Sequence, residues 1–272
     1  MNTHFKKTAI FLLSTMLLVS ACENNEKNAD KNNIPFNEKN EEKPEEVEEQ
    51  VEQEEEAETE TEDPEEEKDE TLTKDIVMDP SSIYALVNRA HTLDASYVPD
   101  DLVTIEVNYI NDMEMVNQLR QEASDALTDL FEEANNVGYS LYAVSGYRSY
   151  EYQEELYDDF VATHGEEEAQ RFSAPPGASE HQTGLSMDIT SEDVAYGLVE
   201  TFGETDDGVW VSENAHRFGF IIRYPYGKED VTGYMYEPWH LRYVGKELAN
   251  DIYESGLAYE EYLREQGIEV EN

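Results

Sequence analysis

An acidic segment of low complexity near the N-terminus is the feature that most constrains the fold. Residues 23–70 contain 23 Asp and Glu against 5 Lys, a net charge of −18, with few apolar residues between them. Such a segment has too little apolar surface to offset the entropy of ordering. A solvated helix around EEVEEQVEQEEEAE is the alternative, but like charges would repel one another along it. We therefore expect a disordered, extended tether over residues 22–76 and a folded domain over residues 77–272.

Residues 1–21 predict a secretory signal peptide. Lys6 and Lys7 precede an apolar run that is short for a membrane span, and small residues then lead to Cys22, the only cysteine in the chain. The ending VSAC resembles the lipobox of bacterial lipoproteins, in which the cysteine is lipidated; the alternative is an ordinary signal with an incidental cysteine. We expect a lipid anchor at Cys22 on the extracytoplasmic face of a bacterial, Gram-positive cell membrane, and no intramolecular disulfide.

The charge of the remaining chain excludes some classes of partner. Residues 71–272 keep a net charge of −30. Nucleic acids and anionic lipid surfaces are therefore poor partners, because like charges repel. We expect no nucleic-acid partner, and we expect a monomer.

Apolar spacing predicts helices and strands after the acidic segment. A helix is expected over 114–136 because apolar residues recur there every three or four positions: Val116, Leu119, Ala123, Leu127, Leu130, Phe131 and Ala134. The stretch YSLYAVSGYRS predicts a strand that ends at Gly146, Tyr147 and Arg148. Ser149 can cap the helix that follows, and a short helix is expected around GEEEAQRF.

The C-terminal half predicts a mixed order of elements. Turn-forming residues in SAPPGASEHQTG predict a loop. Strands are expected at LSMDI, GFIIRYP and HLRYVG. A helix is expected at VSENAHRFGF, where it ends in a turn that leads into a strand. One or two closing helices are expected in GKELANDIYESGLAYEEYLREQG. Because helices and strands do not alternate strictly, we expect an α+β fold, with an antiparallel sheet and flanking helices.

Two of the six histidines stand out as candidate metal ligands. His4 lies in the expected signal, whereas His91, His164 and His216 lie on expected helices or their ends without acidic or histidine partners at ligand spacing. His181 follows the loop SAPPGASE, and His240 ends the segment YEPWH. They are the histidines most suited to a shared site.

The residues around these two histidines suggest a catalytic metal site. Asp188 lies seven positions after His181, and Gly184 between them can form a tight turn that lets both face one point. Two imidazoles and one carboxylate suit Zn²⁺ and leave a fourth position open to water. Glu237, three positions before His240, is the natural general base for that water. The alternative is two unrelated histidines on polar loops.

Three segments carry a resemblance to a known family. SGYRSYEYQEELY, GASEHQTGLSMDI and EPWHLRYVG, in this order, resemble the VanY-like D-alanyl-D-alanine carboxypeptidases, which include vancomycin-resistance enzymes and share the Hedgehog/DD-peptidase fold. The upstream LVNRAHTLDASYVPDDLV also resembles the start of that family's domain. The resemblance covers residues 79–250 approximately and excludes the acidic tether.

The resemblance implies a role for each candidate site residue. It implies zinc held by His181, Asp188 and His240, with Glu237 as catalytic base and proton carrier. It also implies that Arg148 binds the terminal carboxylate of the substrate or polarises the scissile carbonyl. The alternative for Arg148 is a structural salt bridge in an acid-rich protein.

Two further residues follow from the resemblance alone. Gln153 and Ser179 lie where the family has polar contacts to substrate. The expected activity is removal of C-terminal D-alanine from peptidoglycan stem peptides by a D,D-carboxypeptidase. The alternatives are an L,D-carboxypeptidase acting on tetrapeptide stems, an endopeptidase, a non-catalytic wall-binding lipoprotein and a cation-scavenging lipoprotein.

Overall fold

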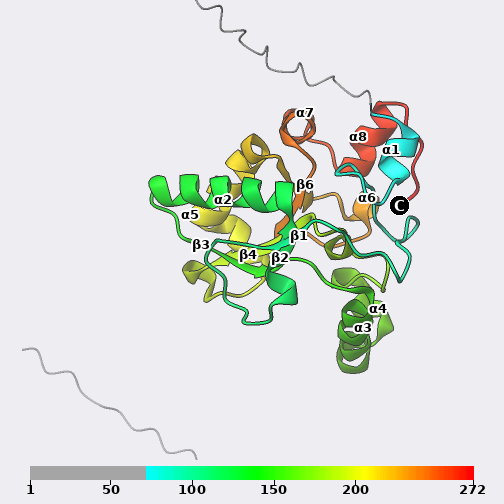
Figure 1. Cartoon of the computed structure of the whole chain (residues 1–272), viewed down its shortest axis with the longest axis horizontal. Helices are drawn as coiled ribbons and strands as arrows, with labels where there is room; N and C mark the ends of the chain where they lie inside the picture. Colours follow the sequence, from blue (N-terminus) through cyan, green and yellow to red (C-terminus); the bar gives the residue numbers. More distant parts are fainter. Residues whose placement is uncertain (1–71) are drawn as a thin grey trace, which may run out of the picture. The chain divides into compact units, whose positions relative to one another are not determined.

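The computed structural model describes residues 72–272 (Figure 1). The expected signal peptide 1–21, Cys22 and all but the last five residues of the expected tether 22–76 lie outside the described residues. The first helix, α1 (Lys74–Met78), spans the boundary expected at residue 77, because Leu72, Val77 and Met78 pack into one apolar cluster. Within residues 72–272, no helix is both long and apolar enough to cross a membrane.

A four-stranded antiparallel sheet organises the fold. Its strand order is β3-β4-β6-β5, and a separate pair of short strands, β1 and β2, is also antiparallel. The strands are β1 (Leu102–Thr104), β2 (Gln118–Arg120), β3 (Leu141–Ser145), β4 (Ser186–Ser191), β5 (Phe220–Tyr224) and β6 (Glu237–Tyr243). The expectation of an α+β fold with an antiparallel sheet is confirmed.

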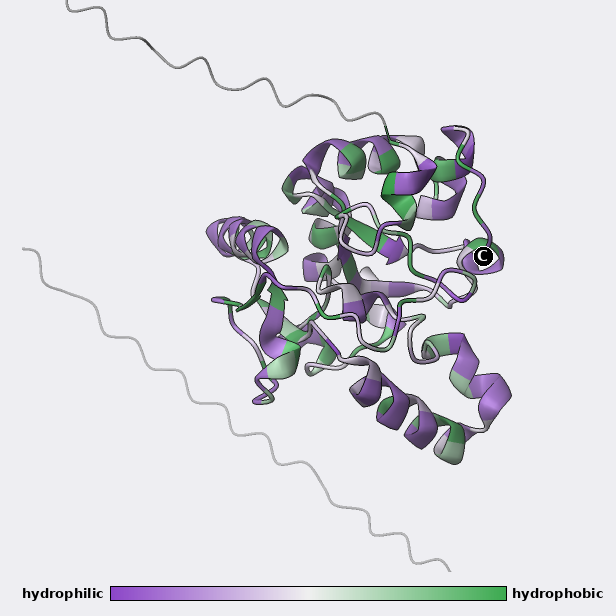
Figure 2. Ribbon diagram, turned by 45° about the vertical axis from the view of Figure 1, so that its right-hand side comes forward, coloured by the Kyte–Doolittle hydropathy of each residue, from purple (hydrophilic) through white to green (hydrophobic). Residues whose placement is uncertain are grey.

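Helices surround the sheet in Figure 1. The α-helices that follow α1 are α2 (Gln121–Asn136), α3 (Tyr150–His164), α4 (Glu166–Phe172), α5 (Asp206–Asn214), α6 (Glu229–Thr232), α7 (Lys246–Ser255) and α8 (Tyr259–Glu265). The 3₁₀ helices are η1 (Met115–Asn117), η2 (Glu180–Thr183), η3 (Glu192–Val194), η4 (Glu200–Glu204) and η5 (Ala215–Phe218). Helices α3 and α4 form a largely hydrophilic arm, at the lower right of Figure 2.

The two faces of the sheet differ in chemistry because side chains alternate along a strand. One face carries Met187, Ile189 and Leu241, which pack with the apolar side of α2 in the main core. The opposite face carries Asp188 and His240, which are paired residues on neighbouring strands. The core therefore fixes the strands that place polar side chains on the other face.

The helix expected over 114–136 is wrong in its first turns. The structure has η1 at Met115–Asn117 and the strand β2 at Gln118–Arg120, and α2 begins only at Gln121. Strand β2 pairs with β1, and the guanidinium Nε of Arg120 donates to Asp101 Oδ1 at 2.9 Å. The three-residue spacing of Val116 and Leu119 suits a helix, but tertiary pairing determines the conformation.

Most other expected elements are present, with shifted limits. Ser149 caps α3, where its hydroxyl accepts from the backbone N–H of Tyr152 at 3.2 Å. The expected loop SAPPGASEHQTG contains the 3₁₀ helix η2, and β6 begins at Glu237 rather than at His240. His91 lies outside any helix, contrary to expectation, where its backbone C=O accepts from the N–H of Asn88.

Candidate metal centre

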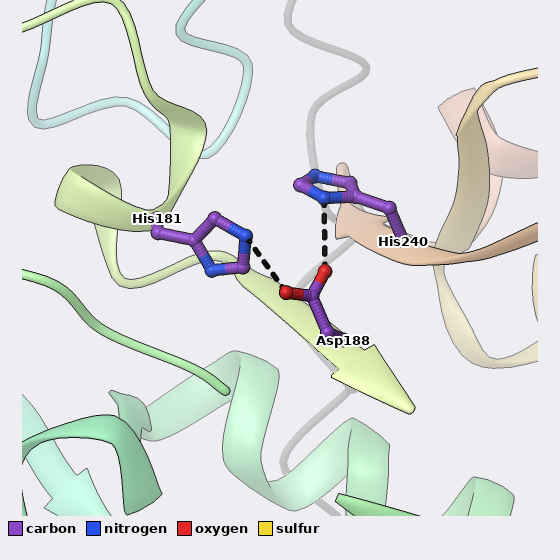
Figure 3. A group of neighbouring side chains, drawn as sticks. All are labelled: His181, Asp188 and His240. Carbon is purple, nitrogen blue, oxygen red and sulfur yellow. Dashed lines mark ion pairs between the residues drawn. The ribbon is translucent and has the colours of Figure 1, made fainter. Parts of the chain in front are cut away.

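Three candidate ligands converge from three elements (Figure 3). His181 lies on η2, Asp188 on β4 and His240 on β6, and all three are buried. Asp188 Oδ2 lies 3.4 Å from His181 Nε2, and Asp188 Oδ1 lies 3.1 Å from His240 Nδ1. One nitrogen or oxygen from each residue lies within 4.8 Å of the others. The structure thus brings the expected ligand set together.

Local backbone geometry turns His181 toward the strands. Gly184 ends η2 with φ +67°, in the left-handed region that glycine adopts without strain. A Cβ there would lie 2.8 Å from the side chain of Leu102. The tight turn expected at Gly184 is confirmed, and it joins η2 to β4 over a short length of chain.

The hydrogen bonds of His181 define its tautomer. Its Nδ1 lies 2.8 Å from the carbonyl oxygen of Gly146, which can only accept, so Nδ1 carries the proton. Nε2 is then left with a lone pair directed toward Asp188. Burial, followed by the charge of Arg148, lowers the pKa of His181 to about 4. A neutral imidazole with this orientation is suited to bind a metal.

An unpaired buried oxygen and the donor atoms around it also fit a cation at this position. Asp188 Oδ1 is buried and has no hydrogen-bond partner among the described residues. Burial opposes charge on His240, but Asp188, Glu180 and Glu237 together raise its pKa to about 9. A proton and a metal would therefore compete for this ring. Two nitrogens and one oxygen match the donor atoms that Zn²⁺ prefers.

The remaining described histidines do not join this group. His91 Nε2 accepts from the backbone N–H of Glu271, His164 ends α3, and His216 stacks on Tyr253 with ring centroids 3.8 Å apart. Within residues 72–272, the His181, Asp188 and His240 group is the one set of three that could hold a metal. The sequence also predicts that these three histidines are not ligands, and that stays a prediction.

Glu237 lies beside the candidate ligands at the start of β6. Its Oε2 is 3.7 Å from His240 Nδ1, and the residue is buried. Burial is the main cause that raises the pKa of Glu237 to about 8; His240 opposes this shift and Asp188 adds to it. A carboxyl group with a raised pKa beside a candidate metal site is suited to move protons.

Arg148 reaches the same site from the end of β3. Its Nη2 donates to Asp188 Oδ2 at 2.8 Å and lies 2.8 Å from His181 Nε2. Its Nη1 donates to Gln153 Oε1 at 3.1 Å, and its Nε donates to Ser145 Oγ at 3.0 Å. Gln153 and Ser145 therefore orient the guanidinium group. Sequence reasoning missed Ser145, although it lies three residues before Arg148 in SGYRS.

A pocket opens over these residues. Its volume is about 720 Å³, and Arg148, Gln153, Ser179, His181, Asp188, Glu237 and His240 all line it. Apolar side chains complete the wall, among them Leu156, Phe160, Phe172 and Trp239. The volume lies in the range of small-molecule sites. Every candidate site residue expected within the folded domain therefore borders one cavity.

Comparison with known proteins identifies relatives of this chain. The family model for VanY, D-alanyl-D-alanine carboxypeptidase, matches residues 116–246. The putative carboxypeptidase YodJ of Bacillus subtilis is 48% identical over 190 residues, covering 70% of this chain and 70% of that protein. A D-alanyl-D-alanine carboxypeptidase of Enterococcus faecalis is 39% identical, covering 65% of this chain and 64% of that protein.

Solved structures show the same fold. The LdcB LD-carboxypeptidase is 49% identical with a TM-score of 0.65, covering 68% of this chain and 87% of that chain. A variant of the vancomycin-resistance D,D-pentapeptidase VanY in complex with Zn(II) is 38% identical with a TM-score of 0.54, covering 67% of this chain and 99% of that chain. The fold and site together define a carboxypeptidase of the Hedgehog/DD-peptidase class. The chain belongs to the VanY family of D-alanyl-D-alanine carboxypeptidases.

Proposed function

We propose that this protein is a zinc-dependent D,D-carboxypeptidase that removes the terminal D-alanine from peptidoglycan stem peptides. The observation that carries the proposal is the buried group of His181, Asp188 and His240, with Glu237 beside it in one pocket. The similarity to enzymes named D-alanyl-D-alanine carboxypeptidase supports the substrate class. Glu237 argues against a non-catalytic binding protein, since such a protein has no need of a base.

The residues of the chain divide the chemistry among them. His181, Asp188 and His240 would hold the zinc ion, which when bound supplies a Lewis acid that polarises the scissile carbonyl and makes water more acidic. Glu237 accepts a proton from the attacking water and passes it to the leaving amine of D-alanine. A nearby cation lowers the pKa of a carboxyl group, which favours the deprotonated base.

Arg148 contributes positive charge for the substrate. Its guanidinium group is held by Ser145 and Gln153 at the edge of the candidate metal site. It binds the terminal carboxylate of the stem peptide or stabilises the developing oxyanion. Gln153 acts through Arg148, and Ser179 contributes a polar group at the pocket wall.

An L,D-carboxypeptidase acting on tetrapeptide stems is the second candidate. It is favoured by similarity, because the LdcB LD-carboxypeptidase is 49% identical to this chain, whereas the VanY structures are 38% identical. Both reactions release one D-alanine, and they differ in the residue that precedes the scissile bond.

Mass spectrometry of defined muropeptides separates these candidates. The zinc-loaded protein is incubated with pentapeptide and tetrapeptide stems, and Glu237→Ala serves as the inactive control. Loss of one alanine from the pentapeptide supports the D,D activity, and loss from the tetrapeptide alone supports the L,D activity. Intact stems in both reactions would contradict a carboxypeptidase.

We also propose that Cys22 anchors the protein to the extracytoplasmic face of the membrane. The basis is the sequence VSAC with its single cysteine. Cys22→Ala should move the protein from the membrane fraction to the medium, because the acyl chains would be missing. Fractionation identical to that of the parent protein would contradict the anchor.

A further inference from the structure

Glu180 lies directly behind one of the candidate metal ligands. It precedes His181 on η2, its side chain is fully buried, and it lines the pocket wall. Its Oε2 lies 3.6 Å from His240 Nε2, on the side of the ring away from Asp188. His240 Nε2 has no polar partner within hydrogen-bond distance among the described residues, and Glu180 Oε2 is the carboxylate oxygen that faces it. Glu180 is thus the acceptor best placed for an N–H on that nitrogen.

Two arginines fix the position of the Glu180 carboxylate. Arg223 Nε and Arg242 Nη1 both donate to Glu180 Oε1 at 2.7 Å. Ser186 Oγ donates to Glu180 Oε2 at 3.3 Å. The side of Oε2 that faces His240 remains available to accept a further hydrogen bond. Both arginines are completely buried, so this carboxylate has no route to an alternative position in solvent.

The arginines are in turn held by distant parts of the chain. Arg223 forms a two-point ion pair with Glu260 on α8, at 2.9 and 2.5 Å. Arg242 Nη2 donates to the backbone carbonyls of Ile83 and Ala85 at 3.1 and 2.6 Å. We call Glu180, Arg223, Arg242 and Glu260 the paired cluster. It connects η2, both strands β5 and β6, α8 and the N-terminal part of the domain.

Stability alone is a poor reason for such a cluster. Four buried charged side chains carry a large desolvation cost, and apolar side chains of similar volume often stabilise a fold as well or better. What the charges achieve here is an ionised carboxylate at a fixed point behind His240. A carboxylate that accepts the second N–H of a metal-binding histidine fixes the tautomer and the ring orientation.

We propose that Glu180 is a positioning residue that accepts a hydrogen bond from Nε2–H of His240 and so presents Nδ1 to the metal. The proposal rests on the metal site of the proposed function. It concerns metal binding, however, and its tests do not require turnover. It assigns a role to the paired cluster, which keeps Glu180 ionised and immobile.

The first test uses the unaltered protein. A long-range ¹H–¹⁵N spectrum of the zinc-loaded, ¹⁵N-labelled chain reports the state of each imidazole nitrogen. The expected result is a protonated, hydrogen-bonded His240 Nε2, slow to exchange with water, together with a metal-bound Nδ1. Zinc bound through Nε2, or an Nε2–H in rapid exchange with water, would overturn the proposal.

The second test compares two isosteric changes in the paired cluster. Glu180→Gln and Glu260→Gln each remove one carboxylate charge that pairs with Arg223, but only the first alters the acceptor facing His240. Competition with a chelator should show zinc binding weakened by about 10- to 100-fold in Glu180→Gln, as for other residues that orient metal ligands. Glu260→Gln should keep the zinc affinity of the parent protein, even if its metal-free form unfolds at a lower temperature.

The outcomes are separable from failure of the proposed function. Equal zinc affinities in both variants, or equal losses in both, would overturn the positioning role. If Glu180→Gln does not fold, the spectrum of the parent protein decides alone. A protein that binds zinc with these properties but cleaves no stem peptide would contradict the carboxypeptidase and leave the role of Glu180 intact.

Discussion

The paired cluster and the candidate metal centre lie on the same face of the sheet, yet they satisfy their buried polar groups in opposite ways. In the paired cluster two arginines balance two glutamates, and all four side chains are bonded within the cluster. At the metal centre, the buried Asp188 Oδ1 has no hydrogen-bond partner within residues 72–272. Unpaired buried polar atoms cost free energy. The first cluster is therefore complete without a ligand, whereas the second is arranged to receive one.

The largest expected effect comes from removing both imidazoles of the metal centre. In the His181→Ala and His240→Ala double variant, zinc content should fall from about one per chain to none, because one carboxylate cannot hold the ion. Elemental analysis and the muropeptide assay measure both losses. Full zinc retention would show that the metal binds elsewhere.

Removing the base should separate activity from metal binding. Glu237→Ala should keep zinc and fold but reduce turnover by about 10²- to 10⁴-fold, the usual contribution of a positioned proton carrier. The measurement is zinc content against turnover number. A variant that cleaves at the parent rate, or that loses zinc as His240→Ala does, would refute the assignment.

A change at Glu260, the member of the paired cluster on α8, should affect stability instead of metal content. Glu260→Ala leaves the buried Arg223 with one carboxylate partner fewer and should cost about 3–5 kcal/mol of unfolding free energy. The matched control is Glu261→Ala, at the neighbouring position. This variant loses a partly exposed ion pair with Lys228 and the hydrogen bond that Glu261 accepts from the backbone N–H of Ala258. It should cost about 1 kcal/mol of unfolding free energy. Denaturant titration compares the two, and equal costs would contradict the structural role of the cluster.

The smallest effect is expected for Arg148. Arg148→Ala should retain zinc and reduce kcat/KM by about 10- to 100-fold on stems with a free terminal carboxylate. This loss corresponds to one hydrogen bond to a charged group, which contributes about 1.5–3 kcal/mol. Stems with an amidated C-terminus serve as the control, since they lack the charge that Arg148 would meet. An equal loss on both substrates would point to oxyanion stabilisation instead of carboxylate binding.

The sequence predicted the parts of the site that depend on local spacing. Seven residues and one tight turn place His181 and Asp188 together, and Glu237 and His240 share one short strand. These placements need little knowledge of tertiary structure. The α+β class also followed from the order of the elements.

Other features depend on contacts between distant segments and leave no local pattern. Glu180 lies within the SEHQ motif, but its partner Arg223 is 43 residues away, so the paired cluster could not be predicted. The prediction of a helix over 114–136 was wrong in its first turns for the same reason, because β2 forms by pairing with β1. Arg148 was placed by its motif, but SGYRS alone does not show which polar neighbour its guanidinium group binds.

The direct pairing of Asp188 with His240 has a consequence for how this chain can change in length. Inserting or deleting a single residue within β4 or β6 would rotate one ligand to the opposite face of the sheet, because the side-chain period of a strand is two. The arm formed by α3 and α4 carries no such constraint at its tip, where Gly165 joins two largely exposed helices. Length variation, whether introduced by engineering or by evolution, should therefore be tolerated at the tip of this arm and excluded from the two strands.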